Sequence, residues 1–308
     1  MHIGIDLGGT KIEAIALDPA GIEQARLRRP TPGGDYAATV AAIGDIVAAL
    51  ESEIPPAAPG ARPPVGVGVP GAPSIQTGLI KNANSTCLIG KPLRADLETA
   101  LGRPVRLAND ANCFAVSEAA DGAAAGADVV FGAILGTGVG GGVVVHGRAL
   151  TGANAIAGEW GHNPLPWPRA DEGEDPGRRC YCGQRGCIET YLSGPGLAAD
   201  HRAAAGTDLD PPDIVLAAAN GEDAARATLA RYHHRLARAL ASVINVLDPD
   251  VIVLGGGLSN MTDLYDIVPR LWTSWVFSDH VETRLTRNRH GDSSGVRGAA
   301  WLWPSSGA

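Results

Sequence analysis

Three cysteines within eight residues constrain this chain more than any other feature of its sequence. They form the pattern C-x-C-x4-C at Cys180, Cys182 and Cys187, with glycines between them. This spacing cannot form one stripe of a helix, and the glycines permit a tight turn in which the three sulfur atoms converge. His162 precedes them at a distance that suits a fourth ligand. Three thiolates and one imidazole form the closed set of a structural zinc site, which we favour over a group of buried or redox-active thiols.

Length and composition indicate a soluble protein of two domains. The chain has 308 residues, of which 45% are hydrophobic and 19% charged, enough to bury a large core. We find no secretory leader and no apolar run long enough to span a bilayer. Five cysteines, an odd number, favour the reducing cytoplasm over a disulfide framework, and we expect Cys87 and Cys113 to be small buried side chains.

The charge balance bears on possible partners. The net charge is −8, and the lysines and arginines are dispersed, so we expect no nucleic-acid partner and no membrane partner. A bound polyanion such as ATP would have to be held mainly by backbone amides and a metal ion. Glycine-rich loops supply such amides.

Apolar and glycine patterns divide the chain into strands and helices. The expected strands are 2–6, 12–17, 22–29, 65–69, 105–108, 129–135, 143–146 and 251–254. The expected helices are 35–53, 93–101, 110–125, 196–205, 212–219, 223–247, 264–275 and 294–303. A strand, a glycine-rich loop and a second strand occur twice, at 6–11 and at 136–142. We therefore expect an α/β fold with a duplicated architecture and a ligand cleft between its halves.

The second glycine-rich loop matches G-x-G-x-x-G only formally. A dinucleotide-binding turn requires a helix directly after it, whereas Val143–Val145 is β-branched and predicts a strand. The phosphate-binding pattern G-x-x-x-x-G-K-[ST] does not occur in the chain. The sequence therefore excludes both of these nucleotide-binding motifs.

Two hairpin turns remain as candidates for binding the phosphates of a nucleotide. Each turn alone is more typical of an ordinary hairpin, but the pair, together with three glycines after a strand, favours nucleotide binding. Asp6 is suited to hold Mg²⁺, directly or through water, and Lys11 adds a cation. The other candidate nucleotide-binding residues are Gly8, Gly9, Thr10, Thr137, Gly138, Gly255, Gly256 and Gly257.

These motifs together resemble the phosphate, adenosine and zinc signatures of ROK-family sugar kinases. They are Asp6–Lys11, Gly136–Gly138, Leu254–Gly257 and Cys180–Glu189, and the similarity extends from Ile3 to Trp303. The resemblance implies the actin-like ATPase fold, which is ribonuclease H-like, with domains at 1–108 plus 293–308 and at 109–292. It further implies ATP, Mg²⁺, a structural Zn²⁺ and a homodimer.

The resemblance also implies roles for individual residues. Read without it, Asn109 and Asp110 are most simply a helix cap. With it, Asp110 matches the catalytic aspartate that accepts the proton of the sugar hydroxyl. The residues that match sugar-binding positions are Asn84, Asn109, Asp110, Glu159, His162 and Glu189. His162 would then bind zinc through one ring nitrogen and face the sugar with the other.

Within the family, the segments 81–86, 159–167 and 290–298 most resemble bacterial fructokinases that also accept mannose. We therefore expect phosphorylation of D-fructose to fructose 6-phosphate, with mannose or glucose as weaker substrates. N-acetylglucosamine kinase and glucokinase are the alternatives, although the acetamide group needs extra room. A sugar-responsive ROK regulator is less favoured, because such regulators carry a winged helix before the kinase-like part, whereas here Asp6 begins the phosphate motif directly.

Overall fold

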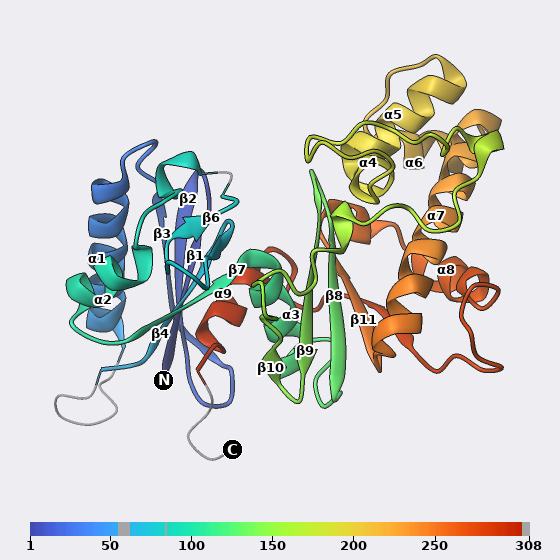
Figure 1. The fold of residues 1–308 in the computed structure, drawn as a ribbon. Coiled ribbons are helices and arrows are strands. Elements are labelled where there is room, and N and C mark those ends of the chain that lie inside the picture. The colour runs from blue at the N-terminus through green and yellow to red at the C-terminus, as the bar shows by residue number, and fades with distance from the viewer. Residues whose placement is uncertain (55–61, 84, 304–308) are drawn as a thin grey trace. The chain divides into compact units, whose positions relative to one another are not determined.

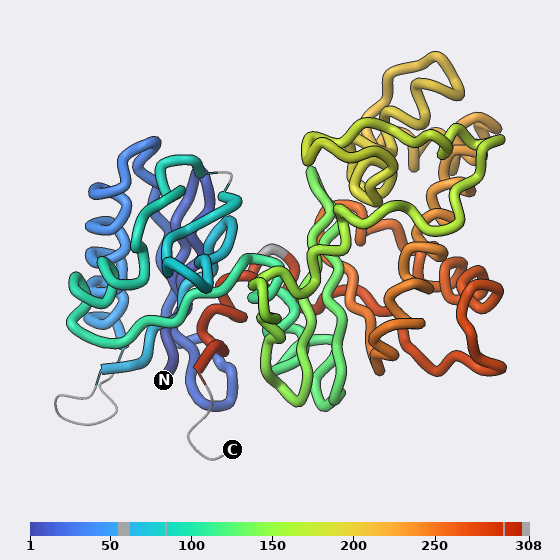
Figure 2. Tube along the Cα trace, viewed as in Figure 1, coloured from blue at the N-terminus to red at the C-terminus, as the bar shows by residue number. Residues whose placement is uncertain are grey.

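The computed structural model describes residues 1–54, 62–83 and 85–303. The chain folds into two compact units, each assembled from separate stretches of sequence (Figure 1). The first comprises Met1–Gly126, Gly142–Ala157 and Arg289–Ala308, and the second comprises Ala127–Gly141 and Gly158–Asn288. Figure 2 follows the chain to its last segment, which returns to the first unit. The domain bounds expected from the sequence stay a prediction.

The first unit is built on a five-stranded sheet with the order β3-β2-β1-β4-β7. Its strands are β1 (His2–Leu7), β2 (Lys11–Leu17), β3 (Glu23–Pro30), β4 (Val65–Val69) and β7 (Val105–Asn109). Strands β1, β2 and β3 are antiparallel neighbours, and β1, β4 and β7 run parallel. The short strands β5 (Ala72–Pro73) and β6 (Ile80–Lys81) form a separate hairpin.

Alternation along β1 assigns its side chains to two layers of this unit. Ile3 and Ile5 are fully buried in a core shared with α1 (Tyr36–Glu53) and α2 (Leu93–Leu101). Gly4 faces the other side, where α9 (Ser294–Ala300) approaches so closely that a Cβ atom at Gly4 would lie 2.1 Å from the Val296 carbonyl oxygen. Helix α3 (Asp110–Ala120) packs beside α9.

A second five-stranded sheet repeats this plan, with the order β10-β9-β8-β11-β12. Its strands are β8 (Val129–Leu135), β9 (Val139–Val145), β10 (Arg148–Ala149), β11 (Val251–Gly255) and β12 (Arg284–Arg287). Strand β11 runs parallel to both β8 and β12, as β4 runs parallel to β1 and β7. The expected α/β fold with a duplicated architecture is therefore confirmed.

Strand β9 begins at Val139, four residues before the start expected from the sequence, so the expected loop 136–142 is wrong in its second half. The glycines there lie within the strand because other backbone approaches it. A Cβ atom at Gly141 would lie 2.7 Å from the Gly158 carbonyl oxygen, and one at Gly142 would lie 2.5 Å from that of Ala111. The turn that remains is Gly136–Gly138.

The second unit carries most of the helices. They are α4 (Glu189–Leu192), α5 (Gly194–Ala205), α6 (Pro211–Ala219), α7 (Asp223–Leu247) and α8 (Leu264–Trp272). Ser193 begins α5 as its cap, because its hydroxyl accepts a hydrogen bond from the Gly196 amide at 3.1 Å. Among the helices in the described part of the chain, none is both long enough and apolar enough to cross a membrane.

Candidate active site and metal centre

Asp6 lies near the end of β1, directly opposite Glu13 on β2. Burial, together with the negative charges of Asp110 and Glu13 and against the opposing effect of Lys11, raises the pKa of Asp6 to about 6. The influence of Asp110 indicates two neighbouring carboxylates that resist being ionised together. Such a pair is suited to a divalent cation.

Asn109 and Asp110 lie where β7 ends and α3 begins. The side-chain oxygen of Asn109 accepts a hydrogen bond from the Ala111 amide at 2.9 Å, and its amide group donates to the Gly71 carbonyl oxygen at 3.2 Å. Asp110 is the first residue of α3, and its Oδ1 atom lies 2.8 Å from the same Ala111 nitrogen. Surrounding protein atoms raise the pKa of Asp110, whereas hydrogen bonds from Ala111 and Asn109 lower it.

The first glycine turn joins β1 to β2. The Gly8 amide donates to the Lys11 carbonyl oxygen at 3.0 Å, which closes a tight hairpin with Gly9 and Thr10 exposed at its tip. Lys11 Nζ lies 3.3 Å from Glu13 Oε2. The fully buried Glu13 also pairs with two arginines of β3, Arg26 and Arg28.

In the second unit, the turn Gly136–Gly138 and the segment after β11 line one cavity of about 950 Å³. Thr137 and Gly257 are the expected nucleotide-binding residues that line it. Several other lining residues were not predicted from the sequence, and they include Pro195, Ala198, Arg202, Val215, Asn260 and Met261. They come from helices and loops that carry no motif, so no local pattern could have identified them.

Gly256 has a structural role close to this cavity. Its φ is 80°, and a Cβ atom there would lie 2.4 Å from the Leu135 carbonyl oxygen, so only glycine fits. Gly255 is the last residue of β11. Gly138 faces Glu189 instead, because a Cβ atom at Gly138 would lie 2.7 Å from Glu189 Oε2.

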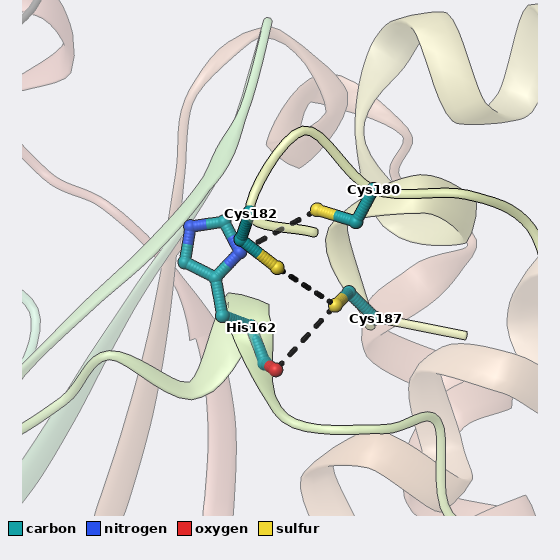
Figure 3. A group of neighbouring side chains, drawn as sticks. All are labelled: His162, Cys180, Cys182 and Cys187. Atoms are coloured by element: carbon teal, nitrogen blue, oxygen red, sulfur yellow. Dashed lines mark hydrogen bonds between the residues drawn. The ribbon is translucent and has the colours of Figure 1, made fainter. Parts of the chain in front are cut away.

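The structure brings His162, Cys180, Cys182 and Cys187 together, as the sequence predicts (Figure 3). Their ligand atoms all lie within 4.8 Å of one another. Cys180 Sγ is 3.7 Å from His162 Nδ1, and Cys182 Sγ is 3.6 Å from Cys187 Sγ. We call these four residues the knuckle.

The other nitrogen of His162, Nε2, lies 3.1 Å from the hydroxyl oxygen of Tyr181, a side chain that is 83% exposed. The part of Tyr181 that lies against the protein loses water, which raises its pKa, and the negative charges of Glu189 and Glu159 add to this effect. Tyr181 therefore contacts one expected sugar-binding residue, His162, and is influenced by the charges of two others. Tyr181 was not predicted from the sequence, although its place between two cysteine ligands was a usable signal.

Glu189 is the first residue of α4, and its Oε2 atom accepts a hydrogen bond from the Val139 amide at 2.9 Å. Glu159 directly precedes the short helical turn Trp160–His162 and is exposed. Asn84, the remaining expected sugar-binding residue, lies outside the described residues. The structure thus groups Glu159, His162 and Glu189 in the second unit and holds Asn109 and Asp110 together in the first.

Comparison with known proteins identifies relatives over nearly the whole chain. The sequence model of the ROK family matches residues 2–306. The N-acetyl-D-glucosamine kinase of Salmonella paratyphi C is 42% identical over 304 residues, which cover 98% of this chain and 99% of the relative. A ROK hexokinase from Thermus thermophilus superposes with a TM-score of 0.85 at 31% identity, covering 98% of this chain and 97% of the other. A ROK-family glucokinase from Streptomyces griseus, solved with glucose and AMPPNP, gives 0.72 at 27% identity, covering 98% of each chain.

These relatives overturn the expected substrate. D-Fructose is wrong, because the full-length relatives at 42% identity are named N-acetyl-D-glucosamine kinase. Residues of two of the segments that favoured fructose form hydrogen bonds within the chain. Asn163 and Leu165 form backbone hydrogen bonds to Ile188 and Gly186, and Lys81 Nζ donates to the Asn154 carbonyl oxygen at 3.0 Å. These contacts fix the local course of the backbone.

The match to the family model and the identity to full-length relatives agree with the motifs on which the resemblance rested. The shared fold, with its two sheets of equal strand order, agrees with the expected actin-like ATPase architecture. The resemblance to ROK-family sugar kinases is confirmed, and the chain belongs to the ROK family.

Proposed function

We propose that this chain transfers the γ-phosphoryl group of ATP to a hydroxyl group of N-acetyl-D-glucosamine. The choice of this substrate rests on the 42% identity to N-acetyl-D-glucosamine kinases, which extends over 98% of this chain and 99% of the relative. The cavity lined by Thr137 and Gly257 is the proposed nucleotide site, because its volume of about 950 Å³ is large enough to hold a nucleotide.

Asp110 is the proposed general base. It accepts the proton of the attacking hydroxyl as that oxygen bonds to the γ-phosphorus and the bond to the departing ADP breaks. Phosphoryl transfer depends mainly on alignment and charge neutralisation, so a carboxylate is a sufficient base. The upward direction of the Asp110 pKa strengthens it in this role.

Asp6 and the first glycine turn are proposed to receive the phosphates. Mg²⁺ bound with ATP neutralises negative charge on the phosphoryl oxygens. Asp6 holds this ion, directly or through water, since it carries one of two neighbouring carboxylates. The exposed tip at Gly9 and Thr10 offers backbone amides, and Lys11 contributes a positive charge moderated by its ion pair with Glu13.

Sugar hydroxyls both donate and accept hydrogen bonds, so carboxylates, imidazoles and amides can read their arrangement. Glu159, His162 and Glu189 are the proposed sugar-binding residues of the second unit. Asn109 and Asp110 are those of the first unit, where the Asn109 amide is already oriented by the Gly71 carbonyl oxygen.

We also propose that the knuckle binds one structural Zn²⁺. With Zn–S distances of about 2.3 Å and Zn–N distances of about 2.0–2.1 Å, the edges of a zinc tetrahedron are about 3.5–3.8 Å long. The separations of 3.7 Å between Cys180 Sγ and His162 Nδ1 and of 3.6 Å between Cys182 Sγ and Cys187 Sγ fit these edges. Four protein ligands leave no open position for substrate, so the ion orients His162 and the start of α4 and takes no part in chemistry.

The experiment that tests this function identifies the product. The protein is incubated with Mg-ATP and N-acetyl-D-glucosamine, and the mixture is examined by ³¹P NMR and mass spectrometry. We expect one sugar phosphomonoester and an equal amount of ADP. Release of ADP and free phosphate without a sugar ester would contradict the proposal. Glucose is the second candidate, because the Streptomyces griseus relative is named glucokinase and was solved with glucose.

A further inference from the structure

Arg178 lies two residues before Cys180 of the knuckle and contacts the helices that follow the knuckle. Its Nη1 atom donates to the carbonyl oxygens of Thr190 and Gly196 at 2.8 and 2.9 Å, and its Nη2 atom lies 2.7 Å from Asp200 Oδ1. The guanidinium also lies over the ring of Tyr191, 4.6 Å from its centroid. One planar side chain therefore contacts both α4 and α5.

Helix α4 needs such support because it has only four residues. A helix this short does not hold its own geometry in water. Its N-terminal end is joined to the knuckle, since the Thr190 amide and hydroxyl both donate to the Cys187 carbonyl oxygen, at 2.9 and 2.7 Å. The knuckle thus holds the start of α4, and Arg178 is a separate attachment through the Thr190 carbonyl oxygen.

The first residue of α4 is Glu189, whose carboxylate accepts the hydrogen bond from the Val139 amide. A shift of α4 moves this carboxylate away from that amide. The Val139 hydrogen bond therefore reports the position of Glu189 without any need for a sugar, a nucleotide or turnover.

Asp200 does not depend on Arg178 for its charge balance. Arg235 Nη1 lies 2.7 Å from Asp200 Oδ1, and Arg231 Nε donates to Asp200 Oδ2 at 2.9 Å. Arg235 is fully buried and also pairs with the fully buried Glu174 at 2.7 Å. Removing Arg178 leaves the Asp200 carboxylate paired with two guanidinium groups, so the buried network keeps its charges matched.

We propose that Arg178 is a positioning residue that fixes the Glu189 carboxylate and, through it, the affinity for the sugar. Its role in sugar affinity rests on the proposed function, in which Glu189 contacts the sugar, whereas its role in placing Glu189 does not. The attachment acts alongside the knuckle, so its loss leaves the metal in place.

The test compares Arg178→Met with Arg178→Lys and with a matched control, Arg231→Met. The control removes a different guanidinium from the same Asp200 carboxylate, and its hydrogen bonds go to Asp200 and Thr228 and not to α4. Lysine keeps the charge but cannot bond two carbonyl oxygens and a carboxylate in one plane, so it tests the geometry even if the methionine variant folds poorly. Amide hydrogen exchange of Val139, zinc content and the KM values for N-acetyl-D-glucosamine and ATP are measured for each, with Glu189→Ala as the reference for a lost acceptor.

We expect Arg178→Met to speed exchange at Val139 by about tenfold or more, toward the rate in Glu189→Ala, with an intermediate rate in Arg178→Lys. KM for the sugar rises by about tenfold, while KM for ATP and the zinc content are unchanged. Arg231→Met leaves the Val139 rate unchanged. An unchanged Val139 rate in Arg178→Met, or equal effects of Arg178→Met and Arg231→Met, would overturn the proposal. Faster exchange in a protein whose wild type does not phosphorylate N-acetyl-D-glucosamine supports the placement of Glu189 and contradicts the proposed substrate.

Discussion

The side chains of Asn109 and Asp110 share one backbone amide, that of Ala111, at 2.9 and 2.8 Å. Asn109 also donates to the Gly71 carbonyl oxygen, which fixes its amide plane. The two roles considered for this pair, helix cap and catalytic base, therefore belong to different residues. Asn109 caps α3, so a change at Asp110 can remove a base without removing the cap.

Asp110→Asn is expected to lower kcat by about 10²–10⁴, the usual contribution of a general base, because the amide cannot take a proton. The melting temperature and the affinity for the sugar change little, since Asn109 still caps the helix. Steady-state kinetics and thermal unfolding measure both effects, with the exposed Asp45→Asn on α1 as the control. Near-normal turnover in Asp110→Asn would assign the base to another residue.

Cys182→Ser is expected to lose the metal, lower the melting temperature and raise KM for the sugar more than KM for ATP. The knuckle orients His162 and the start of α4, whereas the 950 Å³ cavity assigned to the nucleotide is lined by other residues. Metal analysis and kinetics are compared with Cys87→Ser, which lies outside the knuckle. Freshly prepared active enzyme without zinc would disprove the metal assignment.

The pKa of Asp6 predicts a pH dependence of stability. Because its pKa in the folded chain is about 6, above the 3.8 of a free side chain, the folded state binds more protons than the unfolded state between these values. The free energy of unfolding therefore falls as the pH rises from about 4 to about 6, by about 1–2 kcal/mol from this group.

Asp6→Asn removes this titration, so its melting temperature should fall less than that of the wild type over the same pH range. Thermal unfolding of both proteins, in buffer without added divalent cation, measures the difference. Adding Mg²⁺ at pH 7.5 should stabilise the wild type and not the variant. Parallel pH curves for the two proteins would contradict the environment we describe for Asp6.

Replacement of glycine by alanine is expected to have opposite effects on stability at two positions. A Cβ atom at Gly298 would lie 1.6 Å from the Cys113 carbonyl oxygen, where α9 crosses α3, so Gly298→Ala should destabilise the chain by about 3 kcal/mol or more. Gly44 lies within α1 with open space at its Cβ position, so Gly44→Ala should stabilise by about 0.5–1 kcal/mol. Urea unfolding measures both, and a neutral Gly298→Ala would show that the two helices separate easily.

The periodic spacing of apolar residues predicted most of the strands and helices, and the four knuckle ligands were predicted together. Buried strands with β-branched residues, such as β4 and β11, left little ambiguity. Strand β12 was missed because Arg284–Arg287 is short, half charged and at the sheet edge. The start of β9 was missed because glycine signals both turns and close backbone contacts, and only the structure distinguishes Gly136 from Gly142.

The substrate could not be predicted in the same way. Glu159, His162 and Glu189 supply groups that can form hydrogen bonds with any hexose. Their presence therefore indicates a sugar substrate but does not identify which sugar it is. The segment 163–167, which favoured fructose, forms the backbone contacts that hold the knuckle and the start of α4. The expected homodimer stays a prediction.

The ranking of sugars is the sharpest test of the proposed function. We would measure kcat/KM for N-acetyl-D-glucosamine, glucose, mannose and fructose at saturating Mg-ATP, using coupled detection of ADP. We predict that N-acetyl-D-glucosamine leads and exceeds fructose by about 100-fold or more, because a site built around a polar substituent strongly rejects a sugar that lacks it. A higher kcat/KM for glucose, mannose or fructose than for N-acetyl-D-glucosamine would contradict the proposed function.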